Sequence, residues 1–132
     1  MASQESRGKI LIVDDESDLV RVLEYGLQSA GYDVVCAADG QEGLKMARES
    51  KPDVILLDLM LPKLDGYKVC RLLKFDDRFK QIPIIILSAR TQEGDQSLAM
   101  EMGANRFVTK PYDFMEILDM IEELRRTHSH RS

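Results

Sequence analysis

The sequence has little of several features that mark particular protein classes. Only two of its 132 residues are cysteines, Cys36 and Cys70, and they lie far apart in apolar surroundings. This predicts buried thiols in a reducing compartment and argues against a disulfide framework or a cysteine zinc site. No apolar run approaches the roughly 20 residues that span a bilayer, and the opening residues lack the apolar core of a secretion signal. We therefore expect a cytoplasmic protein that does not engage a membrane.

Positive charge is also scarce. Lysine and arginine number 18 against 23 aspartates and glutamates, so the formal net charge is −5. Because nucleic acids and anionic membranes attract the opposite charge, direct nucleic-acid binding by this domain is not expected. Hydrophobic residues make up 44% of the chain, which is enough to form the core of one compact domain.

Short apolar runs alternate with segments of helical periodicity. Asp39 and Asp65 stand where N-caps are expected, and Gly31 and Gly103 stand where helices should end. The patterns predict strands at 9–13, 32–36, 53–58, 84–87 and 105–109, and helices at about 19–30, 39–49, 66–73, 92–103 and 113–126.

This alternation predicts a parallel sheet with helices on both faces, because parallel neighbours need helical crossovers. The nearly continuous apolar runs at 53–58 and 84–87 are typical of central strands buried on both sides. In such α/β folds, ligands bind outside the carboxyl ends of the strands. Functional residues are therefore expected directly after each strand.

The residues in those positions are polar and mostly acidic. Carboxylates from neighbouring strands would repel one another and raise at least one pKa, and a divalent cation would relieve the repulsion. Hard carboxylate oxygens are the ligands that Mg²⁺ prefers. Each residue alone also has an ordinary explanation as a helix cap, a turn residue or a surface charge, but their joint placement favours one site. The residues are Asp14, Asp15 and Glu16 after the first strand, Asp58 at the end of the third, Ser88 after the fourth and Lys110 after the fifth.

Four motifs carry a family resemblance. VDDE, DVILLDLMLPKLDG, ILSA and GANRFVTKP occur in this order, and together they resemble the receiver domain of two-component response regulators. The resemblance implies a flavodoxin-like, doubly wound α/β fold with a five-stranded parallel sheet in the order 2-1-3-4-5 and five helices. It implies an N-terminal tail at 1–8, a receiver domain at 9–126 and a C-terminal tail or linker remnant at 127–132. A stand-alone receiver and a piece of a longer regulator both fit.

The resemblance also implies which residues carry the chemistry. Asp58 would be the phosphoacceptor, Lys110 would bind a phosphoryl oxygen, and Ser88 would donate its hydroxyl to another oxygen. The peptide bond from Lys110 to Pro111 would be cis. Phe107 and Ser88 would form the switch, with the ring of Phe107 turning from an exposed to a buried position after phosphorylation.

The same resemblance implies the metal ligands. Asp15 and Asp58 would bind Mg²⁺ directly, Asp14 would act mainly through a metal-bound water, and the carbonyl of Met60 would complete the protein ligands. Met60 and Arg90 would flank the path of the water that hydrolyses the acyl phosphate and so tune its lifetime.

The implied function is a phosphoacceptor signalling switch. A sensor histidine kinase or phosphotransfer protein would donate the phosphoryl group, and the surface at 92–126 would then act on an output domain or target protein. Phosphotransfer and autodephosphorylation are self-directed, so the domain is not expected to be an enzyme. A magnesium-dependent phosphatase that uses Asp58 is disfavoured because no obvious general acid stands beside it. A haloacid-dehalogenase-type phosphatase in particular would need a second Asp where Met60 stands. A receiver without chemistry is disfavoured because the full set of reactive residues is present.

Overall fold

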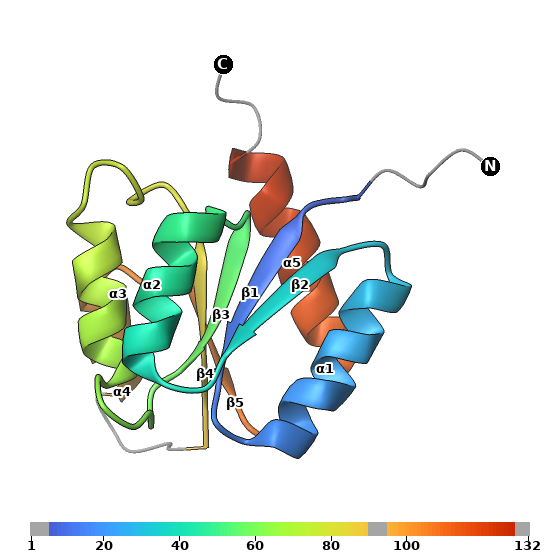
Figure 1. Cartoon of the computed structure of the whole chain (residues 1–132), viewed down its shortest axis with the longest axis horizontal. Helices are drawn as coiled ribbons and strands as arrows, with labels where there is room; N and C mark the ends of the chain where they lie inside the picture. Colours follow the sequence, from blue (N-terminus) through green and yellow to red (C-terminus); the bar gives the residue numbers. More distant parts are fainter. Residues whose placement is uncertain (1–5, 90–94, 129–132) are drawn as a thin grey trace.

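The computed structural model describes residues 6–89 and 95–128, in which strands and helices alternate throughout (Figure 1). All neighbouring strands are parallel, in the order β2-β1-β3-β4-β5, which confirms the expected fold. The strands are β1 (Lys9–Val13), β2 (Asp33–Ala37), β3 (Val54–Asp58), β4 (Ile84–Ser88) and β5 (Arg106–Thr109). The helices are α1 (Ser17–Ser29), α2 (Gly40–Ser50), α3 (Gly66–Lys74), α4 (Asp95–Glu101) and α5 (Phe114–His128).

The sheet separates two apolar cores, because alternate side chains of a strand point to opposite faces. Leu11 and Val13 pack on the face covered by α2, α3 and α4, whereas Ile10 and Ile12 pack on the face covered by α1 and α5 (Figure 1). Every residue of β3 and β4 is buried, as expected of central strands. The polar residues that end these two strands are therefore buried as well.

Helix caps form where the sequence predicts them. Asp39 accepts a hydrogen bond from the backbone N–H of Glu42 at 2.8 Å, and Asp65 accepts one from Lys68 at 3.0 Å. Each cap satisfies a backbone donor that the first turn of a helix leaves unpaired. The starts of α2 and α3 are thus fixed by local chemistry.

The second strand begins one residue later than predicted. The backbone N–H of Tyr32 donates to the carbonyl oxygen of Leu27 at 3.0 Å, so Tyr32 still belongs to the turn that closes α1. Gly31, at a φ of +101°, makes that turn possible. The strand therefore runs from Asp33 to Ala37 instead of from 32 to 36.

Two further expectations concern helices and cysteines. The predicted start of the fourth helix near Gln92 lies outside the described residues, and α4 is described from Asp95 to Glu101. Cys36 and Cys70 are free thiols; Cys70 is buried as predicted, whereas Cys36 is only partly buried, and burial raises the pKa of each to about 11. None of the helices in the described parts of the chain is long and apolar enough to cross a membrane.

The strand register brings the candidate residues to one edge. Asp58 pairs with Leu87 and Ser88 with Thr109, while Val13, the residue before Asp14, pairs with Leu57. The carboxyl ends of the strands lie at the lower edge in Figure 1.

The start of α3 packs against the end of β3. The backbone N–H of Gly66 donates to the carbonyl oxygen of Leu59 at 3.1 Å. A Cβ atom at position 66 would lie 2.7 Å from the Cα of Leu59 and would collide with the carbonyl oxygen of Asp58. Glycine is therefore required for this close approach of two backbone segments.

We expect Gly66→Ala to lower the free energy of unfolding by about 2 kcal/mol, because the added methyl group forces a backbone shift beside Asp58. Urea denaturation followed by circular dichroism measures the change. Gln28→Ala, on the exposed side of α1, is the control and should alter stability by less than about 0.5 kcal/mol. Equal stability of Gly66→Ala and the unmodified protein would show that the contact is not tight.

Candidate functional site

The carboxyl edge of the sheet holds buried polar side chains. Asp14 and Asp58 expose only 4% of their surface and Ser88 exposes none, and these are the buried polar residues of the described chain. The side chain of Lys110 is only 9% exposed. Groups so deeply placed need partners, because an unpaired buried charge is costly.

The ammonium of Lys110 supplies that partner. Its Nζ lies 2.9 Å from Oδ2 of Asp14 and 2.6 Å from Oε1 of Glu16. Oδ2 of Asp58 lies further away, at 3.7 Å from the same nitrogen. Lys110 is thus hydrogen-bonded to the two carboxylates after β1 and within ion-pair distance of the one that ends β3.

Backbone groups orient these side chains. Oδ1 of Asp14 accepts a hydrogen bond from the N–H of Glu16 at 3.0 Å, and Oδ1 of Asp58 accepts one from the N–H of Met60 at 3.2 Å. The N–H of Lys110 donates to the carbonyl oxygen of Ser88 at 2.8 Å, which extends the ladder between β4 and β5 by one residue. The peptide bond that follows Lys110 is cis, as expected.

The carboxylates form a group that could hold a metal ion. Asp14, Glu16 and Asp58 each offer one oxygen, and these oxygens lie within 4.8 Å of one another. Three carboxylates and one ammonium leave two negative charges, which is the charge of one divalent cation. Hard oxygen donors at this spacing fit Mg²⁺, which takes few protein ligands and keeps several waters.

The other predicted site residues are not part of this carboxylate group. Asp15 is exposed, and its carboxylate is not one of the three grouped oxygens. Met60 is 53% exposed. Phe107 is half-buried and packs against the core beneath α2, α3 and α4. Arg90, the other residue expected to tune the lifetime, lies outside the described residues.

Glu16 is a residue of the site to which the sequence assigned no role, although it was noted among the acids after the first strand. It follows the acidic pair, and a carboxylate there has an ordinary reading as the start of α1, where the structure places it as the N-cap residue. Its side chain instead turns back to Lys110, and this depends on how the first turn of α1 leaves the strand. The only signal in the sequence is its place as a third consecutive acid after a strand.

The surroundings shift the pKa of both central groups. Burial raises the pKa of Asp58 from 3.8 to about 6, the hydrogen bond from Met60 works against this, and the neighbouring Asp14 adds to the rise. The expected elevation of one carboxylate pKa is confirmed, with burial rather than repulsion as the largest cause. Burial disfavours the charged form of Lys110, but hydrogen bonds to Glu16 and Asp14 outweigh it and raise the pKa of the ammonium.

Comparison with known proteins gives consistent matches. The family model for the response regulator receiver domain matches residues 10–122. The alkaline phosphatase synthesis transcriptional regulatory protein PhoP of Bacillus subtilis is 45% identical over 118 residues, which are 89% of this chain and 48% of that protein. The chain therefore spans about half the length of this curated relative.

Solved structures resemble the fold closely. The receiver domain of a sensor histidine kinase from Pseudomonas aeruginosa, with a magnesium ion coordinated in its active site cleft, has a TM-score of 0.83 and 32% identity. The alignment covers 90% of this chain and 98% of that one. The BeF3-activated N-terminal receiver domain of RstA from Klebsiella pneumoniae has a TM-score of 0.83 and 30% identity, covering 89% and 98% of the two chains.

Ionised Asp58 should cost stability in the metal-free protein. Because its pKa is raised from 3.8 to about 6 in the folded state, the folded chain holds this proton more tightly than the unfolded chain. The free energy of unfolding should therefore fall as the pH rises from about 4 to about 6 and level off above. Asparagine cannot ionise, so Asp58→Asn should raise the melting temperature at pH 7.5 by about 5 °C.

Thermal melts followed by circular dichroism in EDTA, across a pH series, measure this difference. Asp119→Asn, at an exposed position on α5, is the matched control and should leave the melting curve unchanged. If Asp58→Asn lowered the melting temperature at every pH, ionised Asp58 would not destabilise the metal-free protein.

Proposed function

The chain belongs to the response regulator receiver domain family, and from this membership we propose that Asp58 is the residue that accepts the phosphoryl group. As a member of this family, the chain is a regulatory phosphoacceptor of two-component signalling rather than an enzyme that acts on a separate substrate. One observation carries the assignment to Asp58. It is the buried carboxylate that ends β3, and it faces both an ammonium at 3.7 Å and the oxygens suited to Mg²⁺.

The proposed reaction is a displacement at phosphorus. A carboxylate oxygen of Asp58 attacks the phosphorus of a phosphohistidine, the new O–P bond forms, and the P–N bond breaks with its electron pair returning to the imidazole. A pKa of about 6 leaves Asp58 mostly ionised near pH 7, as a nucleophile must be. Placing the oxygen in line and neutralising charge supply most of the acceleration in such transfers.

Lys110 and Ser88 are proposed to hold the transferred group. The ammonium of Lys110 lies beside Asp58 already and can bind a phosphoryl oxygen as a point charge. Ser88, at the end of the neighbouring strand β4, would donate its hydroxyl to a second oxygen.

The family implies a bound Mg²⁺, and the grouped carboxylates fit it. We propose that Asp14, Asp15, Asp58 and the carbonyl of Met60 hold the ion, with Asp14 acting mainly through water. When bound, it supplies positive charge to the phosphoryl oxygens.

Phosphorylation is proposed to change the surface formed by α4, β5 and α5. It replaces one negative charge at position 58 with about two, so Ser88 and Lys110 are drawn toward the phosphoryl group. Phe107 on β5 would respond to this movement by a change in how its ring packs, because phenylalanine has no hydroxyl group to form a hydrogen bond. Phosphorylation would shift the equilibrium between two arrangements of this surface only to the extent that it stabilises one arrangement more than the other.

Receiver domains imply a cognate histidine kinase, and we propose a sensor histidine kinase or a phosphotransfer protein as the donor. We place this reaction in the cytoplasm, where the unpaired thiols of Cys36 and Cys70 remain reduced. No direct contact with nucleic acid is proposed for this domain, in keeping with its net charge of −5.

Incubation with acetyl phosphate and Mg²⁺ should add the mass of one phosphoryl group. Intact mass spectrometry follows the adduct, and Asp58→Asn should give none. Lys110→Ala should slow adduct formation by about 100-fold, the scale of losing one positioned charge at a developing anion. Glu123→Ala, at an exposed position on α5, is the control and should react at the unmodified rate.

An adduct of equal yield on Asp58→Asn would refute the assignment of the phosphoacceptor. Rapid multiple turnover of acetyl phosphate without an accumulating adduct would identify a phosphatase instead.

The assignment of Asp15 as a metal ligand can be separated from a role for Glu16. Glu16 is hydrogen-bonded to Lys110 at 2.6 Å, whereas within residues 6–89 and 95–128 the Asp15 carboxylate makes no hydrogen bond or ion pair. We expect Asp15→Asn to weaken Mg²⁺ binding by at least about tenfold and Glu16→Gln to weaken it by less than about threefold. Isothermal titration calorimetry with MgCl₂ measures both. The opposite order of losses would make Glu16 the ligand.

A further inference from the structure

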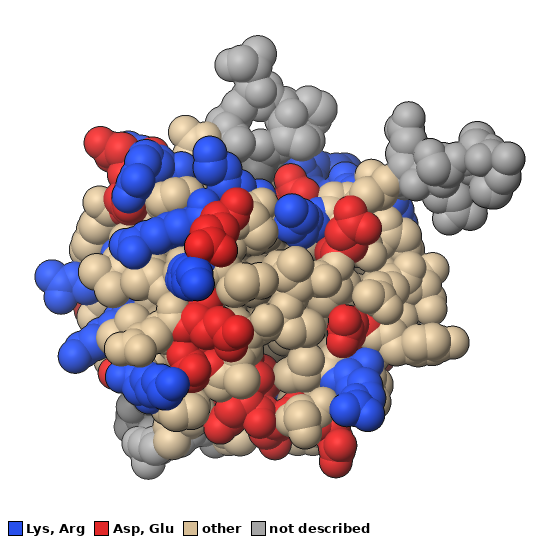
Figure 2. All heavy atoms as spheres, in the orientation of Figure 1, with Lys and Arg blue, Asp and Glu red and all other residues tan. Residues whose placement is uncertain are grey.

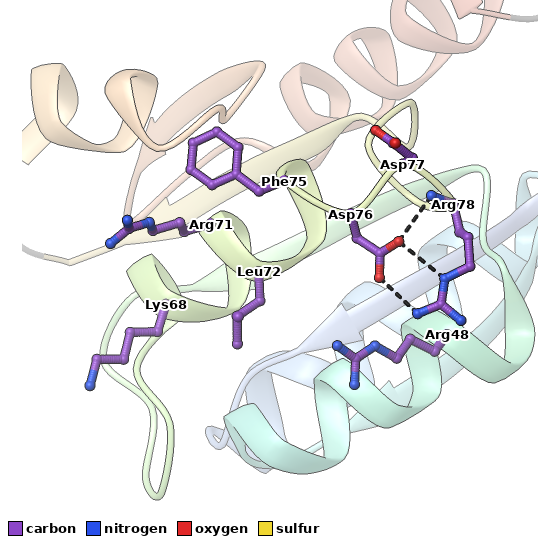
Figure 3. A pocket seen from close by; sticks show the side chains of 8 residues that line it. All are labelled: Arg48, Lys68, Arg71, Leu72, Phe75, Asp76, Asp77 and Arg78. Carbon is purple, nitrogen blue, oxygen red and sulfur yellow. Dashed lines mark hydrogen bonds and ion pairs between the residues drawn. The ribbon is translucent and has the colours of Figure 1, made fainter.

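A groove lies between α2 and α3, away from the acidic edge. It has a volume of about 820 Å³, and α2 and α3 pack side by side beneath it. Figure 3 shows Leu72 projecting from α3 into this space, with Arg48 of α2 on the other side. No residue of the proposed phosphorylation site lines it. The lining residues are Arg48, Lys68, Arg71, Leu72, Phe75, Asp76, Asp77 and Arg78.

The apolar part of the groove is exposed. Phe75 is 72% exposed and Leu72 is 45% exposed. Together with Lys68 and Arg71 they recur at the spacing i, i+3, i+4 and i+7 of one helix face. This face of α3 therefore presents two large apolar side chains beside two cations, and exposed aromatic groups in such settings commonly mark contact sites.

The acids of the groove are already paired within the chain. Asp76 accepts hydrogen bonds from Nε and Nη2 of Arg78 at 3.1 and 2.9 Å, drawn as dashed lines in Figure 3. Asp77 forms an ion pair with Lys80 at 3.2 Å. Arg78 has the larger effect in lowering the pKa of Asp76, and Arg48 also lies close enough to help lower it, so the carboxylates of the groove balance only part of its positive charge.

Three cations of the groove make no close ion pair of their own. In the described parts of the chain, Arg48, Lys68 and Arg71 form no ion pair, although the chain as a whole carries a net charge of −5. The guanidinium of Arg71 lies 5.7 Å from the ring centre of Phe75, which keeps charge and ring together. Figure 2 shows many basic side chains over α2 and α3, with some acidic ones among them on α2 and further acidic ones along the lower edge.

We propose that this groove binds an acidic amphipathic helix of a partner protein. Carboxylates on the flanks of such a helix would pair with Arg48, Lys68 and Arg71, and its apolar side chains would cover Leu72 and Phe75. An acidic helix is favoured because its negative charge is complementary to the positive charge of the groove. A nucleic acid would leave the two apolar side chains unused and would face the 92% exposed side chain of Asp77.

Fluorescence anisotropy tests the proposal with a synthetic probe. The probe is a fluorescein-labelled, end-capped peptide of about 16 residues, helical in design, with leucine along one face and glutamate on both flanks. We expect a dissociation constant on the order of tens of micromolar at low salt, as for small interfaces, and weaker binding as salt screens the ion pairs. The same peptide with lysine in place of glutamate should not bind.

Matched variants locate the binding. Phe75→Ala and Arg71→Glu should each weaken binding by at least about tenfold. Tyr25→Ala and Arg21→Glu change an aromatic side chain of similar exposure and an exposed arginine on α1, on the opposite face of the sheet, and should stay within about twofold. Phe75→Ala should still form the acetyl phosphate adduct at the unmodified rate, which shows that the variant is folded and keeps this result independent of the proposed function.

Three results would overturn the proposal. One is no measurable binding of the acidic peptide, or binding that neither Phe75→Ala nor Arg71→Glu weakens. Another is tighter binding of a DNA or RNA duplex that the same two variants abolish, which would assign the groove to nucleic acid. The third is self-association in analytical ultracentrifugation that Phe75→Ala abolishes, which would assign it to a second copy of the chain.

Discussion

The contact of one buried ammonium with carboxylates from two strands is the constraint on which the site depends. Lys110 reaches Asp14, Glu16 and Asp58, and without it the buried pair Asp14 and Asp58 and the exposed Glu16 would repel one another at the edge of the sheet. This contact requires the carboxyl ends of β1, β3 and β5 to lie at the same edge of the sheet. The parallel pairing of β1 with β3, β3 with β4 and β4 with β5 holds them there. The apolar sandwich thus serves as the frame that holds four charged groups in place.

The same arrangement explains why the site is poised to respond to charge. Lys110 is hydrogen-bonded to the residues after β1 and only approaches Asp58, so its strongest contacts are with groups that do not react. A phosphoryl group at Asp58 would add charge on the far side of the ammonium and compete for it. Because the surroundings are buried, such competition is weakly screened by solvent and salt.

Much of this could be predicted from the sequence, for a physical reason. Parallel strands end at a common edge, so the positions of Asp14, Asp58, Ser88 and Lys110 after successive apolar runs were enough to place them together. The partner of Lys110 was not predictable in the same way. Asp15 and Glu16 are adjacent acids in a loop, and only the direction in which α1 departs decides which one turns inward.

The groove between α2 and α3 could not be predicted from the sequence either. Its cations come from α2, α3 and the turn after α3, and the spacing that puts Lys68 and Arg71 on one face of α3 does not show that Arg48 of α2 shares their surface. The late start of β2 has a similar origin, since the hydrogen bond from Tyr32 to Leu27 belongs to the turn that closes α1. The groove thus depends on the packing of two helices, and the start of β2 depends on the extra hydrogen bond that closes α1.

The position of Gly66 links two of these features. The first turn of α3 rests directly on the backbone of Asp58, and Phe75, the C-cap residue of the helix, lines the groove. A helix of nine residues is about 13 Å long and bends little, so it moves as a stiff rod. Any displacement of the loop after β3 would therefore be delivered at the other end of α3 as a shift of the aromatic ring.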